Sequence, residues 1–411
     1  MDADRAEQMV RAWKSHFGSP DGLLWSRAPG RVNIIGEHTD YNGGYVFPIA
    51  IDRDIVVAFR PNGTRMVNLH ALNLNDDASF ALVDPKADPA HPWMVYPMGI
   101  ARILGEKGVA VPGLDVVFHG TVPTGGGLAS SAALTVAFGL AYSHAAGVVV
   151  RVSDAEDGFR PGGADSVGGS VTRRELALMC QQTEHRFCGV RCGIMDPFVS
   201  LHAERGKAVY IDCRDLRHEL VPCAFPGARF VVCDTRVKHE LASSEYNKRR
   251  AQCEEAVHVL AEFLPAVHSL RDVGIQQFKA YQQRVPSPMR ERARHVITEN
   301  HRVVAARQAM IEGDALRLGI LMDASHDSLD ADYEVTSSEL NLLVGLARDC
   351  KGVFGSRMTG GGFGGCTVTL VAANRVEELC ARVRKGYRER TNVDPHIYVV
   401  EAEQGAEIFA P

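Results

Sequence analysis

The stretch GRVNIIGEHTDYNGG, residues 30–44, places ionisable side chains directly beside a short apolar run. The apolar residues are Val32, Ile34 and Ile35, and the ionisable ones are Arg31, Glu37, His38 and Asp40. A charge that is buried without a partner is energetically costly, so these side chains must pair with one another or with a polar molecule that binds beside them. The alternative is a solvated charged turn on the surface, closed by two glycines.

The composition is that of an ordinary globular protein with room for two domains. The chain has 411 residues, of which 45% are hydrophobic and 23% are charged, and a chain of this length usually divides into more than one core. The formal net charge is −5 and the basic residues are dispersed, so no basic patch for nucleic acid or for a membrane surface is evident. We therefore expect neither as a partner.

The N-terminal segment and the cysteines favour a cytoplasmic protein. The opening residues, MDADRAEQMV, are charged from the second position and lack the apolar core of a signal peptide. No apolar run reaches the ~18 residues that a membrane span needs. The ten cysteines have no regular spacing, which is typical of reduced, buried thiols. A zinc site of Cys180, His185, Cys188 and Cys192 is an alternative, although Cys188 and Cys192 are spaced too widely for a zinc knuckle.

The apolar spacing predicts helices and strands without a regular βαβ repeat, which favours an α+β fold. Helices are predicted at residues 5–17, 93–107, 130–146, 172–187, 243–262, 289–312, 337–349 and 377–387. Strands are predicted within residues 24–73 and at 113–119, 207–213, 229–233, 366–372 and 396–400. Residues 148–171 are rich in glycine and follow neither period, so they are predicted to form an inserted loop. Pro222, Pro226 and Gly227 mark a domain boundary.

The segment PTGGGLASSAA, residues 123–133, has the features of a phosphate-binding loop. Its glycines let the backbone approach an anion closely, and the following helix would offer free N–H groups at its N-terminus. No Gly-Lys-Ser/Thr follows the glycines, so this is not a Walker A loop. The alternative is a plain glycine turn with a serine N-cap.

A second glycine-rich segment, MTGGGFGG at residues 358–365, contains a literal GxGxxG at Gly360, Gly362 and Gly365. A dinucleotide-binding fingerprint requires a helix after the glycines. The residues that follow, 366–371, are predicted to form a strand, and we therefore exclude a dehydrogenase.

Two further carboxylates are candidates for function. Asp196 lies in CGIMDPF, residues 192–198, where an Asp-Pro pair would also suit the N-cap and first position of a helix. Glu184 lies on a predicted helix, where a lone glutamate is usually solvated.

These segments resemble the motifs of the galactokinases, which belong to the superfamily of galactokinase, homoserine, mevalonate and phosphomevalonate kinases. Residues 30–44 match GRVNLIGEHTDYNGG almost letter for letter, and residues 123–133 resemble the phosphate loop PxGxGLxSSAA. Residues 358–365 resemble the closing glycine loop of the superfamily, and residues 243–250, SSEYNKRR, resemble SSEYNxRR. Residues 192–197 resemble CGIMDQ, with Pro197 where the family usually has Gln.

The resemblance implies a two-domain α+β sugar kinase. Residues 1–224 would form an N-terminal α/β domain that has a left-handed βαβ unit and binds sugar and ATP, with 148–171 as an insertion. Residues 225–411 would form a ferredoxin-like C-terminal domain. The reaction would be transfer of a phosphoryl group from ATP to the anomeric hydroxyl of α-D-galactose, which yields α-D-galactose 1-phosphate.

The resemblance also implies a role for each motif residue. Asp196 would accept the proton of the hydroxyl or act only through its charge, and Arg31 would pair with it and stabilise the transferring phosphoryl group. The sugar would contact Arg31, Glu37, His38, Asp40, Gly193, Asp196 and Tyr246. The phosphates would contact Gly125, Gly126, Gly127, Leu128, Ala129, Ser130 and Ser131. Mg²⁺ would be bound by Ser131 and Glu184.

Two other functions compete with this one. The chain could phosphorylate N-acetylgalactosamine or another sugar, or it could be a non-catalytic galactose sensor. A sensor is expected to lose the Ser-Ala pair of the phosphate loop or the aspartate, whereas Ser131, Ala132 and Asp196 are all present. We further expect a monomer, in which residues 148–171 are dispensable for catalysis because they lack a hydrophobic period.

Overall fold

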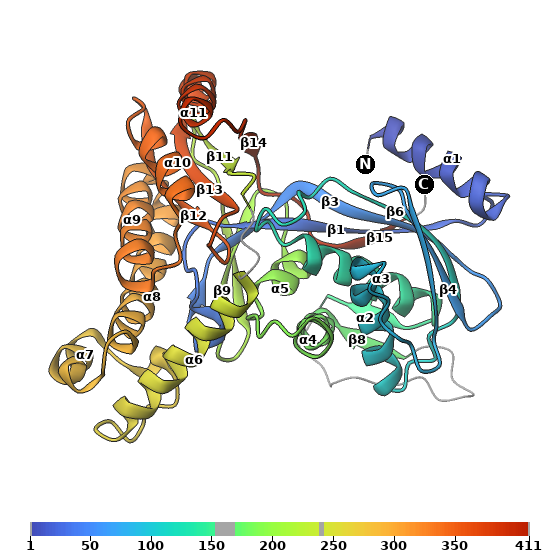
Figure 1. The fold of residues 1–411 in the computed structure, drawn as a ribbon, viewed down its shortest axis with the longest axis horizontal. Helices are drawn as coiled ribbons and strands as arrows, with labels where there is room; N and C mark the ends of the chain where they lie inside the picture. Colours follow the sequence, from blue (N-terminus) through green and yellow to red (C-terminus); the bar gives the residue numbers. More distant parts are fainter. Residues whose placement is uncertain (1, 153–168, 238–241, 410–411) are drawn as a thin grey trace.

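The computed structural model describes residues 2–152, 169–237 and 242–409, which form two lobes (Figure 1). The helices are α1 Ala3–Phe17, α2 Val95–Glu106, α3 Ser130–Ala145, α4 Arg173–Thr183, α5 Met195–His202, α6 Ala242–Ala261, α7 Ile275–Tyr281, α8 Met289–Glu312, α9 Ala315–Ser328, α10 Ser338–Arg348 and α11 Val376–Thr391. The strands are β1 Leu24–Asn33, β2 Tyr45–Val46, β3 Pro48–Pro61, β4 Met66–Ala71, β5 Asp76–Ala81, β6 Leu114–Gly120, β7 Val149–Arg151, β8 Ser170–Thr172, β9 Lys207–Asp212, β10 Arg217–Pro222, β11 Ala228–Asp234, β12 Val353–Thr359, β13 Cys366–Ala372, β14 His396–Val400 and β15 Glu407–Phe409.

The N-terminal lobe is built on a mixed sheet covered on both faces. The strand order is β15-β1-β3-β6-β4-β5, antiparallel except for the parallel pair β4 and β6. Alternate residues of a strand point to opposite faces, and β3 follows this pattern. Val56 and Ala58 pack under α1 with Trp13, whereas Val57 and Phe59 belong to the main core on the other face. Helices α2 to α5 lie on that side (Figure 1).

The C-terminal lobe contains an antiparallel sheet of order β12-β13-β11-β14. Numbered along the chain, the strands stand in the order second, third, first, fourth, with helices after the first and third strands. This arrangement confirms the predicted ferredoxin-like sheet and the α+β class. The last strand, β15, returns to the N-terminal lobe and pairs with β1, so that Phe409 lies opposite Trp25.

Most predicted elements are present within a few residues of the predicted bounds, whereas α7, α9, β5, β10, β12 and β15 were not predicted. The predicted helix at 172–187 ends as α4 at Thr183 and continues as a π-helical turn, Glu184–Cys188. The predicted loop at 148–171 begins and ends with the short parallel strands β7 and β8, and residues 153–168 lie outside the described part. Helix α9 was not predicted, because Gly319 lowers the helix propensity of its sequence. The packing requires this glycine, since a Cβ at position 319 would lie 2.1 Å from the Phe354 carbonyl oxygen.

Within the described ranges, none of the helices combines the length and the hydropathy that crossing a membrane requires.

Candidate active site

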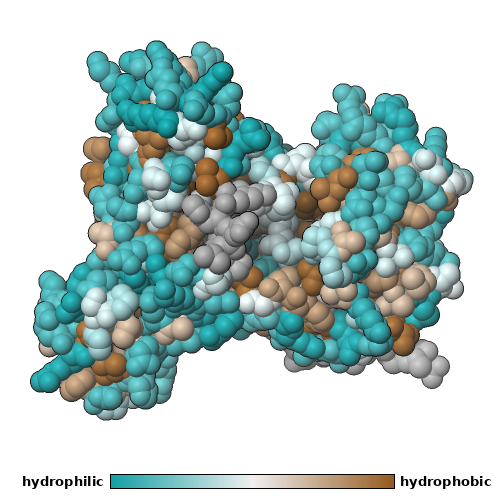
Figure 2. All heavy atoms as spheres, viewed as in Figure 1, coloured by the Kyte–Doolittle hydropathy of each residue, from teal (hydrophilic) through white to brown (hydrophobic). Residues whose placement is uncertain are grey.

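A cavity of about 980 Å³ lies between the lobes, and residues from both of them line it. Figure 2 shows the two lobes with an indentation between them. Of the fifteen residues to which the resemblance gives a role, thirteen line this cavity: Arg31, Glu37, His38, Asp40, Gly125, Gly127, Ala129, Ser130, Ser131, Glu184, Gly193, Asp196 and Tyr246. Gly126 and Leu128 do not line it; Leu128 is buried in the core, and Gly126 lies against Asp234.

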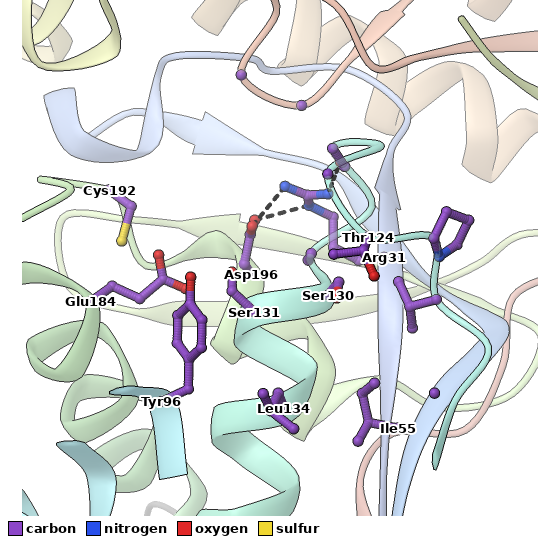
Figure 3. A pocket seen from close by; sticks show the side chains of 18 of the residues that line it. Arg31, Ile55, Tyr96, Thr124, Ser130, Ser131, Leu134, Glu184, Cys192 and Asp196 are labelled. Carbon is purple, nitrogen blue, oxygen red and sulfur yellow. Dashed lines mark hydrogen bonds and ion pairs between the residues drawn. The ribbon is translucent and has the colours of Figure 1, made fainter. Parts of the chain in front are cut away.

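An ion pair between Arg31 and Asp196 lies at the centre of this cavity (Figure 3). The Arg31 guanidinium donates from Nε to Asp196 Oδ1 at 2.9 Å and from Nη2 to Oδ2 at 2.7 Å. Its third nitrogen, Nη1, donates to the Gly127 carbonyl oxygen at 2.6 Å. A two-point contact between a guanidinium and a carboxylate fixes both groups. The pair therefore holds Asp196 beside the phosphate loop.

The interpretation of Asp196 as a helix N-cap is wrong. Helix α5 begins at Met195 with Ile194 as its N-cap, so Asp196 and Pro197 lie inside the first turn. The missing N–H of proline does no harm there, because the first N–H groups of a helix have no partner within it. The Asp196 carboxylate binds Arg31 instead of capping the helix.

The phosphate loop leads directly into helix α3. Gly125 and Gly127 have φ values of 75° and 72°, and Ala129, the N-cap residue, has φ 62°. The alternative of a serine N-cap is not observed: Ala129 occupies that position without a side-chain cap, and Ser130 and Ser131 are the first helical residues. The N-terminus of α3 therefore faces the cavity with two hydroxyl groups, as suits an anion.

Glu184 lies across the cavity from the start of α3 (Figure 3). It opens the π-helical turn after α4, and such turns are frequent at functional sites. Burial raises the pKa of its carboxyl group, while a hydrogen bond with the Ser131 hydroxyl opposes the increase. Tyr96 also lies near Ser131 (Figure 3). A glutamate and a serine thus lie near one another at the start of α3.

Asp40 lies beside Asp196 at the other end. Its Oδ1 accepts a hydrogen bond from the Tyr41 N–H at 2.9 Å, and its Oδ2 faces the Met195 N–H at 3.4 Å. Burial, followed by the nearby charge of Asp196, raises the pKa of the Asp40 carboxyl group to about 6. This carboxylate can therefore accept hydrogen bonds from a polar ligand that replaces its lost water.

Glu37 and His38 connect the first motif to the glycine loop of the C-terminal lobe. Glu37 is 1% exposed, forms an ion pair with Arg357 and accepts from the Gly360 N–H at 3.0 Å. Burial raises the pKa of its carboxyl group. The His38 ring contacts the Gly361 carbonyl oxygen through Nε2 at 3.2 Å. The closing glycine loop is therefore part of the cavity wall, at Gly360 and Gly361.

The four zinc-ligand candidates do not form a metal site. His185 Nε2 is bonded to the Cys192 carbonyl oxygen at 2.7 Å, and all ten cysteines are free thiols. In the described part of the chain, three such ligand atoms converge only at His16, His70 and Asp77. There the Nδ1 of His70 is bonded to Asp77 at 2.9 Å and the two imidazole rings stack, so contacts within the group account for its geometry.

The apolar wall of the cavity was not predicted from the sequence. It includes Ile55, Leu74, Trp93, Phe118, Val122 and Leu134, and Asp234 and Arg236 of the C-terminal lobe also line the cavity. These residues come from strands, helices and the loops between them, whose ordinary apolar patterns carry no signal for a ligand. Tyr96, at the start of α2, was counted only as part of an apolar helix.

Comparison with known proteins agrees with this geometry. A family model described as the galactokinase galactose-binding signature matches residues 11–61. The models for the GHMP kinases N terminal domain and the GHMP kinases C terminal match residues 96–158 and 306–389. A curated galactokinase of Chloroflexus aurantiacus is 43% identical over 93% of this chain and 92% of its own length. That of Enterococcus faecalis is 36% identical over 97% of this chain and 98% of its own length.

Among solved structures, the galactokinase of Lactococcus lactis complexed with galactose superposes with a TM-score of 0.89. It is 31% identical in sequence, and the match covers 98% of this chain and 99% of that one. The sequence identity extends over both lobes of the described fold. The chain therefore belongs to the galactokinase family of the GHMP kinases.

Proposed function

We propose that this protein transfers the γ-phosphoryl group of ATP to the anomeric hydroxyl of α-D-galactose, yielding α-D-galactose 1-phosphate and ADP. The observation that carries the proposal is the Arg31–Asp196 pair, which lies between the phosphate loop and the polar end of the cavity. Phosphoryl transfer depends on positioning and on stabilising charge, and this pair supplies an acceptor and a cation at one point.

The polar end of the cavity suits a sugar. Asp40 offers a buried carboxylate, and Tyr246 and His38 offer aromatic surface with their rings 5.3 Å apart. We assign the sugar to Arg31, Glu37, His38, Asp40, Gly193, Asp196 and Tyr246. Within this set, the oxygens of Glu37 are already engaged by Arg357 and Gly360, so we assign it to shaping the site rather than to a strong contact with the sugar.

The remainder of the cavity suits ATP. The phosphates would lie on Gly125, Gly127, Ala129, Ser130 and Ser131, at the N-terminus of α3. Gly126 and Leu128 do not line the cavity, so any contribution from them would come from their backbone. The apolar wall around Trp93 and Phe118, whose rings are 5.2 Å apart, would take the adenine base.

Mg²⁺ fits the pair formed by Ser131 and Glu184. Both side chains offer oxygen, the ligand type that Mg²⁺ prefers, and burial makes the ionised Glu184 carboxylate costly until a cation compensates it. When bound, the ion would offset negative charge on the phosphates of ATP.

In the proposed reaction, Asp196 accepts the proton of the anomeric hydroxyl or holds that hydroxyl through its charge. Arg31 keeps the carboxylate in place and stabilises charge on the phosphoryl group as it moves.

The competing functions predict different results in one assay. ATP consumption is measured with galactose, N-acetylgalactosamine, glucose and arabinose, and the product is identified by ³¹P NMR. We expect the highest kcat/KM with galactose and a sugar 1-phosphate as product. A higher value with N-acetylgalactosamine would reassign the substrate. Binding of galactose without turnover in the presence of ATP and Mg²⁺ would favour a sensor.

A further inference from the structure

A chain of hydroxyl and thiol groups leads from the cavity into the C-terminal lobe, and no motif in the sequence indicates it. His38 Nδ1 lies 2.7 Å from the Tyr41 hydroxyl, which lies 2.8 Å from the Tyr333 hydroxyl. The Tyr333 hydroxyl in turn lies 3.1 Å from Cys253 Sγ. Tyr333 comes from the π-helical turn after α9 and Cys253 from α6, so the chain joins the first motif to two distant elements.

The direction of each hydrogen bond follows from the one at the cavity end. The partner of His38 Nε2 is the Gly361 carbonyl oxygen at 3.2 Å, and a carbonyl can only accept, so Nε2 carries a proton. In a neutral imidazole, Nδ1 is then the acceptor, and the Tyr41 hydroxyl must donate its single proton to it. The Tyr41 oxygen accepts in turn from Tyr333, and the Tyr333 oxygen accepts from the Cys253 thiol.

The neutral form of His38 fits its surroundings. Burial, followed by the charge on His295, lowers the pKa of the His38 imidazole to about 3. Arg249 and Arg357 add to the effect, because a positive charge on His38 would be repelled by both of them. The neutral Nε2–H tautomer of His38 therefore accounts for both hydrogen bonds of the ring.

The far end of the chain is held rigidly. Tyr333 is fully buried, and its carbonyl oxygen accepts from Arg249 Nε at 2.8 Å. Its ring lies 4.7 Å from the His38 ring and 4.7 Å from the His295 ring, while the His295 Nε2 contacts the Glu37 carbonyl oxygen at 3.2 Å. Tyr333 thus cannot turn away from Tyr41 without moving the wall behind the first motif.

We propose that Tyr41 and Tyr333 are positioning residues that hold the His38 ring, as its neutral Nε2–H tautomer, in the orientation in which this N–H donor lines the sugar end of the cavity. The proposal deepens the proposed function, on which the identity of the ligand rests. A sugar hydroxyl oxygen would share this donor with Gly361 or replace Gly361 as its partner. The two tyrosines act through His38 and need no contact with the sugar.

The tautomer can be measured without any ligand, by ¹⁵N NMR of the imidazole groups. The His38 signals are assigned with His38→Gln. We expect a protonated Nε2 and an unprotonated Nδ1 in the unmodified protein at neutral pH. A protonated Nδ1 would overturn the proposal, whether or not the protein is a galactose kinase.

Two substitutions test the positioning. Tyr41→Phe removes the hydroxyl group that holds Nδ1, so we expect a shift of the His38 Nδ1 signal, a less fixed ring and a KM for galactose raised roughly tenfold, as for the loss of one buried hydrogen bond. Tyr333→Phe leaves that donor in place but frees the Tyr41 hydroxyl to rotate, so a smaller increase of about threefold is expected. In both variants kcat and the KM for ATP should stay within about twofold.

The matched control is Tyr281→Phe, because Tyr281 stacks on Phe263 away from the cavity and should leave tautomer and KM unchanged. If Tyr41→Phe and Tyr333→Phe keep the His38 Nδ1 signal and the KM for galactose, or if they lower kcat and alter the KM for ATP to the same degree, the residues only support the fold. If the protein has no sugar kinase activity but Tyr41→Phe shifts the His38 Nδ1 signal as expected, the positioning holds and the proposed function fails.

Discussion

Gly193 lies so close to Asp40 that a Cβ at position 193 would be 1.8 Å from Asp40 Oδ2 and 1.9 Å from its Cγ. The contact joins two motifs that are far apart in the sequence, and it leaves the Asp40 carboxylate no freedom on that side. The glycine before Ile194 is therefore required by the position of the carboxylate.

Gly193→Ala should lower kcat/KM for galactose by at least about 100-fold, because the methyl group would displace Asp40 by an ångström or more. Gly105→Ala is the control, since Gly105 in α2 has open space around its Cβ position. That variant should be fully active. Steady-state kinetics with circular dichroism would check both, and a Gly193→Ala enzyme with normal kinetics would contradict the close contact.

Asp196→Asn should reduce kcat by roughly 10²–10⁴-fold, as for the loss of a general base. Because the amide keeps nearly the same shape, galactose affinity measured by calorimetry should change little. If kcat drops by less than tenfold, the carboxylate is not the proton acceptor and acts at most through its charge.

Glu184→Ala should raise the Mg²⁺ concentration for half-maximal activity by roughly tenfold or more, since a metal site with few protein ligands loses one of them. Titration of the rate with Mg²⁺ at saturating ATP and galactose measures this. Glu255→Ala, at an exposed position of α6, is the control. An identical titration for both variants would remove Glu184 from the metal site.

The raised pKa of Asp40 predicts a dependence of sugar binding on pH. The carboxylate ionises as pH rises through about 6, so lowering the pH from 7 to 5 protonates most of it and should weaken galactose binding about tenfold. Calorimetry without nucleotide avoids titration of ATP. Asp40→Asn should abolish this dependence, whereas Asp52→Asn, at an exposed position, should retain it.

The same pKa has a consequence for stability. Folding raises the pKa of the Asp40 carboxyl group, so between pH 4 and 6 this group is protonated in the folded state and ionised in the unfolded state. The stability that this bound proton contributes is lost as pH rises through 6. Asp40→Asn should therefore raise Tm at pH 7.5 more than at pH 4.5. An equal change of Tm at both values would mean that the Asp40 carboxyl group has an ordinary pKa.

Asp40 should also recognise the 4-hydroxyl group of the sugar by accepting its hydrogen bond. A site with a buried acceptor can discriminate by ~10⁴-fold against a sugar that does not supply the matching hydrogen-bond donor. We therefore expect negligible activity with glucose. A double-mutant cycle compares galactose with 4-deoxygalactose in the unmodified protein and in Asp40→Ala. If removal of the 4-hydroxyl costs the same in both proteins, another residue contacts it.

The motifs and most elements could be read from the sequence alone. Residues 30–44, 123–133 and 358–365 carry their chemistry in short runs, because a loop that binds phosphate needs consecutive glycines and a helix start. The periods of apolar residues likewise predict helices and strands locally, since each element buries one face. The family resemblance and the α+β class follow from these local patterns.

The partners of the charged residues were decided only by the tertiary structure. Arg31 finds Asp196 at a separation of 165 residues, and Arg357 finds Glu37 across the two lobes. The interpretation of Asp196 as an N-cap is wrong for this reason. A local sequence pattern indicates only contacts between neighbouring residues, whereas the distant Arg31 guanidinium offers Asp196 two charged hydrogen bonds. The hydroxyl chain from His38 to Cys253 and the apolar wall near Trp93 likewise depend on how strands and helices pack, which no stretch of neighbouring residues encodes.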